Sequence, residues 1–181
     1  MQYRKAIACD LSAIVALQNK NIVSVLNPSE QSDGFLSTAF SIEQFKRIND
    51  ALGVFVCIDK AKVCGYVCAT TVDFNHTFPL QAAMLSALQS VVYDDEPVLS
   101  FRLFFVSPVC IDKPYRGGEA LKKLVQLMLG TIRQDFDLVL TLVSSQNARS
   151  LRAVQKHGMK MLHSFNWQGQ LFYVLSYTLS P

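Results

Sequence analysis

Two adjacent glycines, Gly117 and Gly118, separate a strand-like run that ends at Ile111 from apolar residues at helical spacing that begin at Ala120. The first amides of a helix lack partners within the helix, and the helix dipole adds partial positive charge there. Glycines let an anion approach the backbone closely, and Arg116 can add a charge-assisted hydrogen bond. These residues predict a cradle for a diphosphate. A plain tight turn is the structural alternative.

A second polar group follows the next strand-like run, at Asn147 and Ser150. Asparagine is a favoured N-cap, so it predicts the start of a helix that continues to about Lys156 and stops at Gly158. Ser145 is the other candidate for this cap. The asparagine therefore has a structural explanation beside any role in binding.

The two groups together resemble a known pattern. The run 109–121 resembles the acetyl-CoA signature of the GNAT N-acetyltransferase superfamily, in which a strand leads to an Arg/Gln-x-x-Gly-x-Gly/Ala loop that opens a helix. The run 147–153 resembles the second motif of that family, with Gly158 in the place of its later glycine. The resemblance implies transfer of an acetyl group from acetyl-CoA to a primary amine of a small molecule or protein, by direct attack.

The resemblance also implies roles for individual residues. The amides of 116–120 would bind the diphosphate of CoA, and the edge of the strand at 109–111 would pair with its pantetheine arm. An amide near Ile111 would donate to the acetyl carbonyl, and Asn147 would bind the pantetheine with Ser150 beside it. The implied cofactor-binding residues are Val109, Cys110, Ile111, Arg116, Gly117, Gly118, Glu119, Ala120, Asn147 and Ser150.

Two positions depart from the family pattern. Counted from Arg116, the loop is one residue short, and a shift by one aligns Gly118 and Ala120 but leaves the carboxylate of Glu119 close to the phosphates. Many family members carry a tyrosine seven residues after the asparagine, where it can protonate the leaving thiolate. Here that position holds Val154, so the sequence does not identify the acid.

A general base must deprotonate the attacking ammonium. The weak candidates are Tyr93 and Glu96, in an acidic run that is also typical of a solvated turn. Cys110 lies in an apolar strand and is interpreted as packing rather than as a nucleophile. The catalytic residues are therefore unknown from the sequence.

Hydrophobic periodicity predicts the elements that position these groups. We expect a strand over 2–7, a helix over 11–26, and a second helix from Ser41, with Gln44 as its capping-box partner. A hairpin over 54–72 and a helix over 80–92 come next. A long strand over 99–111 with a bulge or bend at Pro108, a helix from Ala120, a strand over 138–143 and a final antiparallel pair over 161–179 follow. This order predicts an α/β (α+β) fold, a three-layer αβα sandwich around a mixed, mostly antiparallel sheet of about seven strands, in one domain over 1–181.

Composition narrows the class of protein. Half of the 181 residues are hydrophobic and 17% are charged, which excludes a disordered chain. The net charge of +3 comes from scattered residues, so we expect no nucleic-acid partner. The five cysteines favour reduced thiols in the cytoplasm, and no ligand pattern predicts a metal. The sequence shows no signal peptide and no apolar run of about 18 residues, so we expect no membrane partner.

The sequence also bears on other functions. Val154 and the short loop both favour a non-catalytic acyl-CoA-binding or regulatory module. A dinucleotide-binding domain would need a glycine loop after the first strand, and 8–11 contain none. The amine acceptor is not identified, and the apolar final hairpin allows a homodimer.

Overall fold

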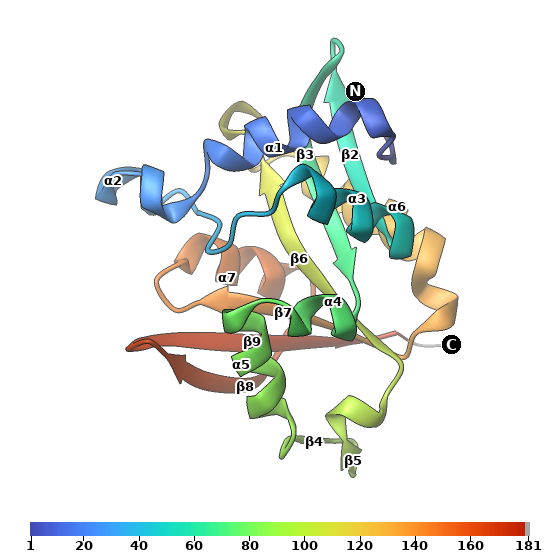
Figure 1. Cartoon of the computed structure of the whole chain (residues 1–181), viewed down its shortest axis with the longest axis vertical. Coiled ribbons are helices and arrows are strands. Elements are labelled where there is room, and N and C mark those ends of the chain that lie inside the picture. Colours follow the sequence, from blue (N-terminus) through green and yellow to red (C-terminus); the bar gives the residue numbers. More distant parts are fainter. Residues whose placement is uncertain (180–181) are drawn as a thin grey trace. The chain divides into compact units, whose positions relative to one another are not determined.

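The computed structural model describes residues 1–179. Its strands form a seven-stranded sheet in the order β1-β2-β3-β6-β7-β9-β8 (Figure 1). The bounds are β1 Gln2–Lys5, β2 Gly53–Asp59, β3 Lys62–Thr70, β6 Leu103–Ile111, β7 Leu138–Ser144, β8 Lys160–Trp167 and β9 Gln170–Thr178. The β6–β7 pair is parallel, whereas β1–β2, β2–β3, β7–β9 and β8–β9 are antiparallel. The mixed, mostly antiparallel sheet flanked by helices is as predicted.

The chain divides into two units, and β6 contributes to both. The first unit holds Met1–Ala69 and Ser107–Ile132, and the second holds Thr70–Val106 and the chain from Arg133 onward. The expectation of a single domain over 1–181 stays a prediction. No helix among residues 1–179 is long and apolar enough to cross a bilayer.

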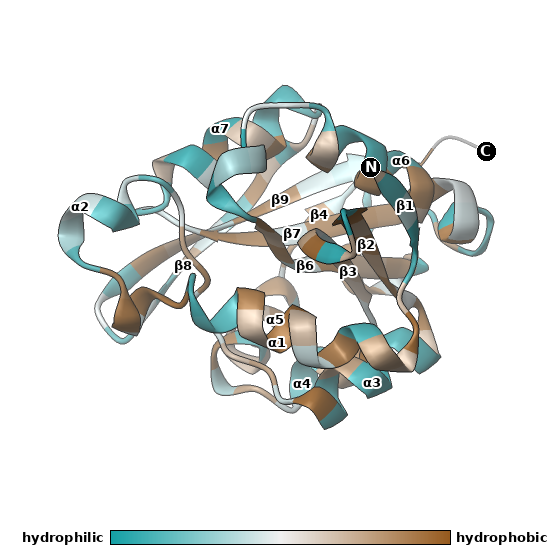
Figure 2. Ribbon diagram, turned by 90° about the horizontal axis from the view of Figure 1, so that it is seen from above, coloured by the Kyte–Doolittle hydropathy of each residue, from teal (hydrophilic) through white to brown (hydrophobic). Residues whose placement is uncertain are grey.

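In the first unit, helices cover both faces of β1, β2 and β3. Helix α3 (Ile42–Ala51) and helix α6 (Ala120–Ile132) both contact β2, and α1 (Leu11–Asn19) contacts α3. Figure 2 shows α6 on one side of these strands and α1 with α3 on the other. Strands β2 and β3 are consequently buried along nearly their whole length, which explains why their residues are apolar on both faces.

Helix α3 begins where the sequence places its cap. The Ser41 side chain accepts from the Gln44 amide at 3.2 Å, and the Gln44 side chain accepts from the Ser41 amide at 2.7 Å. This reciprocal pair satisfies two amides that the first turn leaves open. The buried residues Phe45 and Ile48 then hold the helix against the sheet.

In the second unit, α5 (Pro79–Leu88) packs on the sheet. Its members Met84, Leu85 and Leu88 share one core with Leu103 and Phe105 of β6. The same core includes Leu138 and Leu140 of β7, and Val174 of β9. Helices α4 (Val72–His76) and α7 (Ala148–Lys156) and the short hairpin of β4 (Val92–Tyr93) and β5 (Glu96–Pro97) complete this unit.

Several predicted boundaries are wrong. The helix predicted over 80–92 ends at Leu88, because the chain turns there and Val92 belongs to β4. The hairpin predicted over 54–72 ends at Thr70, because Thr71 caps α4. The strand predicted over 2–7 ends at Lys5, because the Asp10 carboxylate accepts from the Ile7 amide at 2.8 Å and from the Arg4 guanidinium at 2.6 Å. The strand predicted from 99 begins at Leu103, after a 3-10 turn over Val98–Ser100.

The helix predicted over 11–26 ends at Asn19 instead. Beyond it Ile22 forms an isolated parallel bridge to Leu36, which a continuing helix would prevent. Asn27 does not end that helix but caps a separate short one, α2 (Pro28–Gln31), through a capping box with Glu30. Apolar spacing alone could not separate these turns, because the interrupted segment keeps the same periodicity.

Candidate functional site

Strand β6 extends well beyond its ladder with β7. The ladder runs from the Leu103–Leu138 pair to the Phe105–Leu140 pair, whereas β6 continues to Ile111. The Thr141 hydroxyl donates to the Val106 carbonyl at 2.8 Å, directly after the ladder ends. The strand residues 107–111, which include the predicted pantetheine edge, therefore lie outside this ladder.

The end of β6 has a defined backbone orientation. The Asp112 amide donates to the Cys64 carbonyl of β3 at 2.8 Å. In a planar trans peptide the carbonyl of the preceding residue points the opposite way, so the Ile111 carbonyl points away from β3. In a strand the amide and carbonyl of one residue share a direction, so the Ile111 amide also points away from β3. That amide is the predicted donor to the acetyl carbonyl.

The strand is irregular on the way to this end. The Val106 carbonyl also points away from β3, toward Thr141. Backbone directions alternate along a regular strand, so Val106 and Ile111 should point in opposite directions. Both point the same way, which requires one irregularity between them, where the sequence predicts a bulge or bend at Pro108.

The bend after β6 opens directly onto a helix. Tyr115 and Arg116 donate to the carbonyls of Asp112 and Lys113, and the first bond of α6 runs from the Lys123 amide to the Glu119 carbonyl at 3.0 Å. Among the backbone hydrogen bonds of residues 1–179, none uses the amides of Gly117, Gly118 or Glu119. The glycine loop therefore places unpaired amides next to a helix start.

Space beside these amides is open. A Cβ added at Gly117 would meet nothing within 4 Å, and one at Gly118 would meet only the Tyr115 carbonyl oxygen, at 3.8 Å. Gly117 has φ of +81°, a conformation that favours glycine. The Gly117 residue thus permits the turn, whereas Gly118 leaves room beside the backbone.

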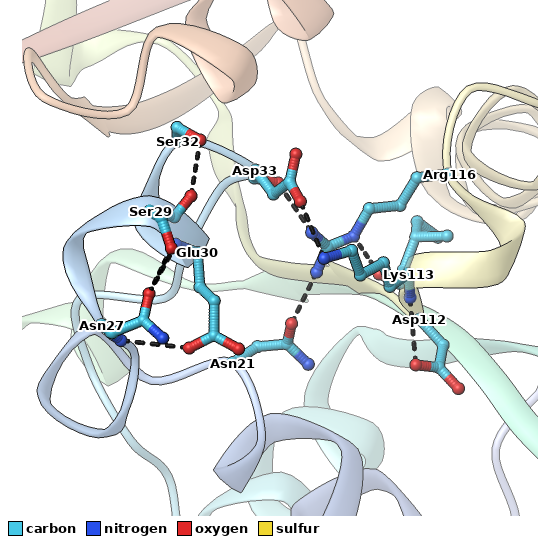
Figure 3. A network of polar contacts seen from close by, with 10 residues as sticks. Asn21, Asn27, Ser29, Glu30, Ser32, Asp33, Asp112, Lys113 and Arg116 are labelled. Carbon is cyan, nitrogen blue, oxygen red and sulfur yellow. Dashed lines mark hydrogen bonds and ion pairs between the residues drawn. The ribbon is translucent and has the colours of Figure 1, made fainter.

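The Arg116 side chain has three hydrogen-bond partners within the chain, and its predicted phosphate contact stays a prediction. Its guanidinium donates to the Ile111 carbonyl at 2.7 Å, to the Asp33 carbonyl at 2.7 Å and to the Asn21 side-chain oxygen (Figure 3). The structure uses this side chain to join the end of β6 to the segment after α1, because these three acceptors surround it.

Other polar contacts hold the bend to its neighbours. The Lys62 ammonium lies 2.7 Å from the Asp112 carboxylate, and the Tyr115 hydroxyl donates to Asp59 at 2.9 Å. Partial burial is the largest single effect and opposes ionisation of Asp112. The hydrogen bond and charge of Lys62, with the Lys113 amide and the charge of Lys20, together outweigh it, so the pKa of this carboxyl is below its usual range. Lys113 lies 3.1 Å from Asp33 at the surface. The bend is thus anchored to β2, β3 and the segment before α3.

The carboxylate of Glu119 has a cationic neighbour. Lys122 Nζ lies 3.6 Å from it, one helical turn along α6. Lys123 instead lies over the ring of Tyr3, 5.5 Å from its centroid. The two adjacent lysines therefore serve different contacts, and only Lys122 offsets the charge of Glu119.

In the second unit, Asn147 is the N-cap of α7. Its side-chain oxygen accepts from the Ser150 amide at 3.1 Å, and the residue is buried. The predicted cap is confirmed, whereas the predicted contact with pantetheine stays a prediction. The sequence did not indicate Gln170, which donates to the Ser144 hydroxyl at 2.6 Å and so supports the turn before Asn147.

The weak candidates for catalysis, Tyr93 and Glu96, both lie in the second unit. The Tyr93 hydroxyl contacts the Thr178 hydroxyl at 2.5 Å. Glu96 is exposed in the β4–β5 hairpin. The catalytic role of both residues stays a prediction.

Two further residues carry no catalytic feature. Burial raises the pKa of the Cys110 thiol to about 12, so it stays protonated, in agreement with its interpretation as packing. Val154, in the place of the family tyrosine, is a half-buried residue of α7. Among residues 1–179 no group of three His, Cys, Asp or Glu side chains could hold a metal ion.

Similarity to known proteins is visible in structure only. No family model matches the sequence, and no curated protein matches it. Among solved structures, the chain is similar to ribosomal-protein-alanine N-acetyltransferase from Brucella melitensis, with 15% identity, coverage of 99% of this chain and 100% of that one, and a TM-score of 0.62. It is also similar to an acetyltransferase of the GNAT family from Streptococcus pneumoniae, with 16% identity, 99% coverage of both chains and a TM-score of 0.61. The fold is that of the GNAT N-acetyltransferases.

A third structure with the GNAT fold is yncA from Salmonella typhimurium, a suspected acetyltransferase solved with its cofactor acetyl-CoA. It shares 15% identity, with coverage of 100% of this chain and 95% of that chain and a TM-score of 0.65. At such identity the likeness establishes the GNAT fold, and the chemistry must be argued from the residues of this chain.

The contacts of Arg116 generate a first prediction. Arg116→Lys removes the planar fork that serves three acceptors, so we expect a loss of about 2 kcal/mol in the free energy of unfolding, measured by urea titration. Lys113→Met is the matched control, because its exposed ion pair with Asp33 should contribute less than about 0.5 kcal/mol. Equal stability of the two variants would show that the fork does not hold the bend.

Proposed function

We propose that this chain is an N-acetyltransferase that transfers the acetyl group of acetyl-CoA to a primary amine by direct attack. The observation that carries the proposal is the run of unpaired amides at Gly117, Gly118 and Glu119, which directly precedes α6 and has open space beside it. Amides at a helix start favour a phosphate through both hydrogen bonding and the helix dipole.

The residues present fit the diphosphate of CoA. The amides from Gly117 to Ala120 would hold it, and Lys122 keeps the nearby carboxylate of Glu119 partly neutralised. Arg116 would contribute by fixing the bend rather than by touching phosphate, since its donors already serve three acceptors of the chain. Acetyl-CoA supplies the activated acetyl group as substrate.

Ile111 would support the transfer itself. Its amide points away from β3 and could donate to the acetyl carbonyl, where negative charge develops as the amine attacks. A carbon–nitrogen bond then forms, the carbon–sulfur bond breaks, and the proton lost by the amine balances the proton gained by the thiolate. The chain offers no assigned acid, because Val154 stands in the usual place.

The alternative function is a non-catalytic acyl-CoA-binding or regulatory module. Val154 is the specific observation that favours it, because valine cannot protonate a thiolate. The alternative shares the binding surface with the enzyme and differs only in turnover.

Turnover separates the two functions. Purified chain mixed with acetyl-CoA and a panel of primary amines should release CoA thiol, followed with a thiol reagent after subtraction of the exposed Cys9 thiol. Binding of CoA in calorimetry without thiol release from any amine would favour the module. Absence of CoA binding would reject both.

A negative charge introduced into the glycine loop should weaken binding at the proposed diphosphate site. Gly118→Glu places a carboxylate beside the open amides, so we expect acetyl-CoA affinity to fall at least about 10-fold, or 1.4 kcal/mol, in calorimetry. Gly118→Gln has nearly the same size without the charge and should keep most of the affinity. Both variants should fold, because a Cβ there has only one neighbour within 4 Å. Equal affinities would argue against a phosphate at this position.

Variants of Asn147 distinguish its role as the N-cap of α7 from its predicted role in binding pantetheine. Asn147→Asp keeps an oxygen that can accept from the Ser150 amide, so the N-cap of α7 should be retained and stability should fall less than in Asn147→Ala. The variant loses the side-chain NH₂ donor, so we expect the KM for acetyl-CoA to rise roughly 10-fold, as for a lost hydrogen bond of about 1.4 kcal/mol. Asn147→Ala should lose both stability and affinity. An unchanged KM in the aspartate variant would leave Asn147 with its structural role alone.

A further inference from the structure

Two cysteine sulfurs meet in the first unit. Cys57 Sγ of β2 and Cys64 Sγ of β3 are 3.0 Å apart, both side chains are fully buried, and both residues are free cysteines. The Cys64 thiol also lies 3.2 Å from the Cys57 carbonyl as a hydrogen-bond donor. This pairing is different from the nearest pair in the sequence, Cys64 and Cys68.

A β-bulge explains why these sulfurs face each other. Cys57 pairs with Gly65 and Ile58 pairs with Val63, so Cys64 is an extra residue in β3. A bulge places two residues opposite one on the partner strand and redirects the side chain of the extra residue. Cys64 is thereby turned toward Cys57, and Gly65 adds no side chain between them.

The separation is close to that of a covalent bond. A disulfide needs about 2.05 Å between its sulfurs, so closure requires an approach of roughly 1 Å. Neighbouring strands of an established hairpin already hold both residues, which lowers the entropic cost of bringing them together.

We propose that Cys57 and Cys64 form a redox modification site, at which a small peroxide closes an intramolecular disulfide that a dithiol reductant reopens. In the closing step each thiol gives up one proton and one electron, the sulfur–sulfur bond forms, and hydrogen peroxide is reduced to two waters. In the reverse step the reductant becomes a disulfide and returns both thiols.

The burial of Cys57 and Cys64 limits the size of the oxidant that can reach their sulfurs. Both sulfurs are inaccessible, so only a small oxidant reaches them without unfolding, whereas a bulky thiol reagent meets Cys9 first. Burial, with Cys57 beside it, raises the pKa of Cys64 to about 12, which keeps the reduced Cys64 thiol protonated and slow to react at neutral pH. The oxidised form would be equally shielded from bulky reductants.

The hairpin end enclosed by the two cysteines supports the bend after β6. The Cys64 carbonyl accepts from the Asp112 amide, Lys62 pairs with the Asp112 carboxylate, and Asp59 accepts from the Tyr115 hydroxyl. A disulfide would staple this end, so the Asp112 amide should exchange its hydrogen more slowly in the oxidised chain. The redox state of Cys57 and Cys64 would thus change the stability of the bend after β6.

The test uses the full chain with Cys9→Ser, which removes the exposed thiol that could link two molecules. Native protein is treated with hydrogen peroxide and the peroxide is removed. The protein is then unfolded in denaturant so that its remaining thiols can be alkylated, and the products are measured by intact mass and peptide mapping. We expect a mass loss of about 2 Da, two fewer alkylated thiols and a Cys57–Cys64 linked peptide, all reversed by dithiothreitol.

Variants give the matched comparison. Cys57→Ala and Cys64→Ala should each abolish the 2 Da loss, whereas Cys68→Ala, on the same strand, should retain it. Linkage of a different pair, addition of oxygen to single cysteines, or retention of all four thiols at a peroxide dose that oxidises Cys9 in the unchanged chain would overturn the proposal. The test uses no acetyl-CoA, so its result is independent of the proposed acetyltransferase activity.

Discussion

The hydrogen bond from the Asp112 amide to the Cys64 carbonyl determines the geometry of the open end of β6. It joins the last peptide of the strand to β3, and peptide planarity then turns the Ile111 carbonyl to the other side. Arg116 binds that carbonyl and continues to the Asp33 carbonyl and Asn21, so the bend is held from two directions. The unpaired amides of the glycine loop follow this bend directly and lead into α6.

A basic residue in such a loop could either contact phosphate or hold the loop in place. A guanidinium that contacted phosphate directly would need its fork free, but the fork of Arg116 serves three acceptors of the chain. By the proposed function, affinity for the diphosphate would come from backbone amides, and Arg116 would hold them in place. Preorganised amides lose little conformational entropy when an anion binds, so a loop held by Arg116 would bind a diphosphate at low entropic cost.

The sequence predicted those parts that depend on local signals. The capping box at Ser41 and Gln44, the hairpin of β2 and β3, and the cap at Asn147 each depend on a few neighbouring residues, and each is confirmed. The end of α1 at Asn19 depends on the bridge from Ile22 to Leu36, which no local pattern reveals. The expectations of one domain, a cytoplasmic location and a homodimer stay predictions.

The site was predicted less completely, because its side-chain contacts are long-range. Arg116 reaches Asn21, a residue nearly a hundred positions earlier, so its structural role was hidden in the sequence. The pairing of Cys57 with Cys64 depends on a bulge, and bulges shift register without leaving a clear mark on alternation. Tyr93 and Glu96 lie in the short β4–β5 hairpin of the second unit, whereas the glycine loop belongs to the first, so their proximity to β6 in the sequence does not by itself assign them a catalytic role.

Val154 bears on rate rather than on binding. The amides of the glycine loop and the Ile111 amide lie on the first unit, whereas Val154 lies on α7 of the second, so none of the contacts that form the proposed diphosphate site uses it. General acid catalysis contributes roughly 10²–10⁴-fold to a rate, while orientation and an oxyanion donor contribute separately. A chain without the tyrosine would therefore keep the part of catalysis that positioned amides provide, with water as proton donor to the thiolate. An enzyme and a binding module would need the same bend, the same unpaired amides and the same open edge of β6. They would differ only in how much rate enhancement is left without a general acid.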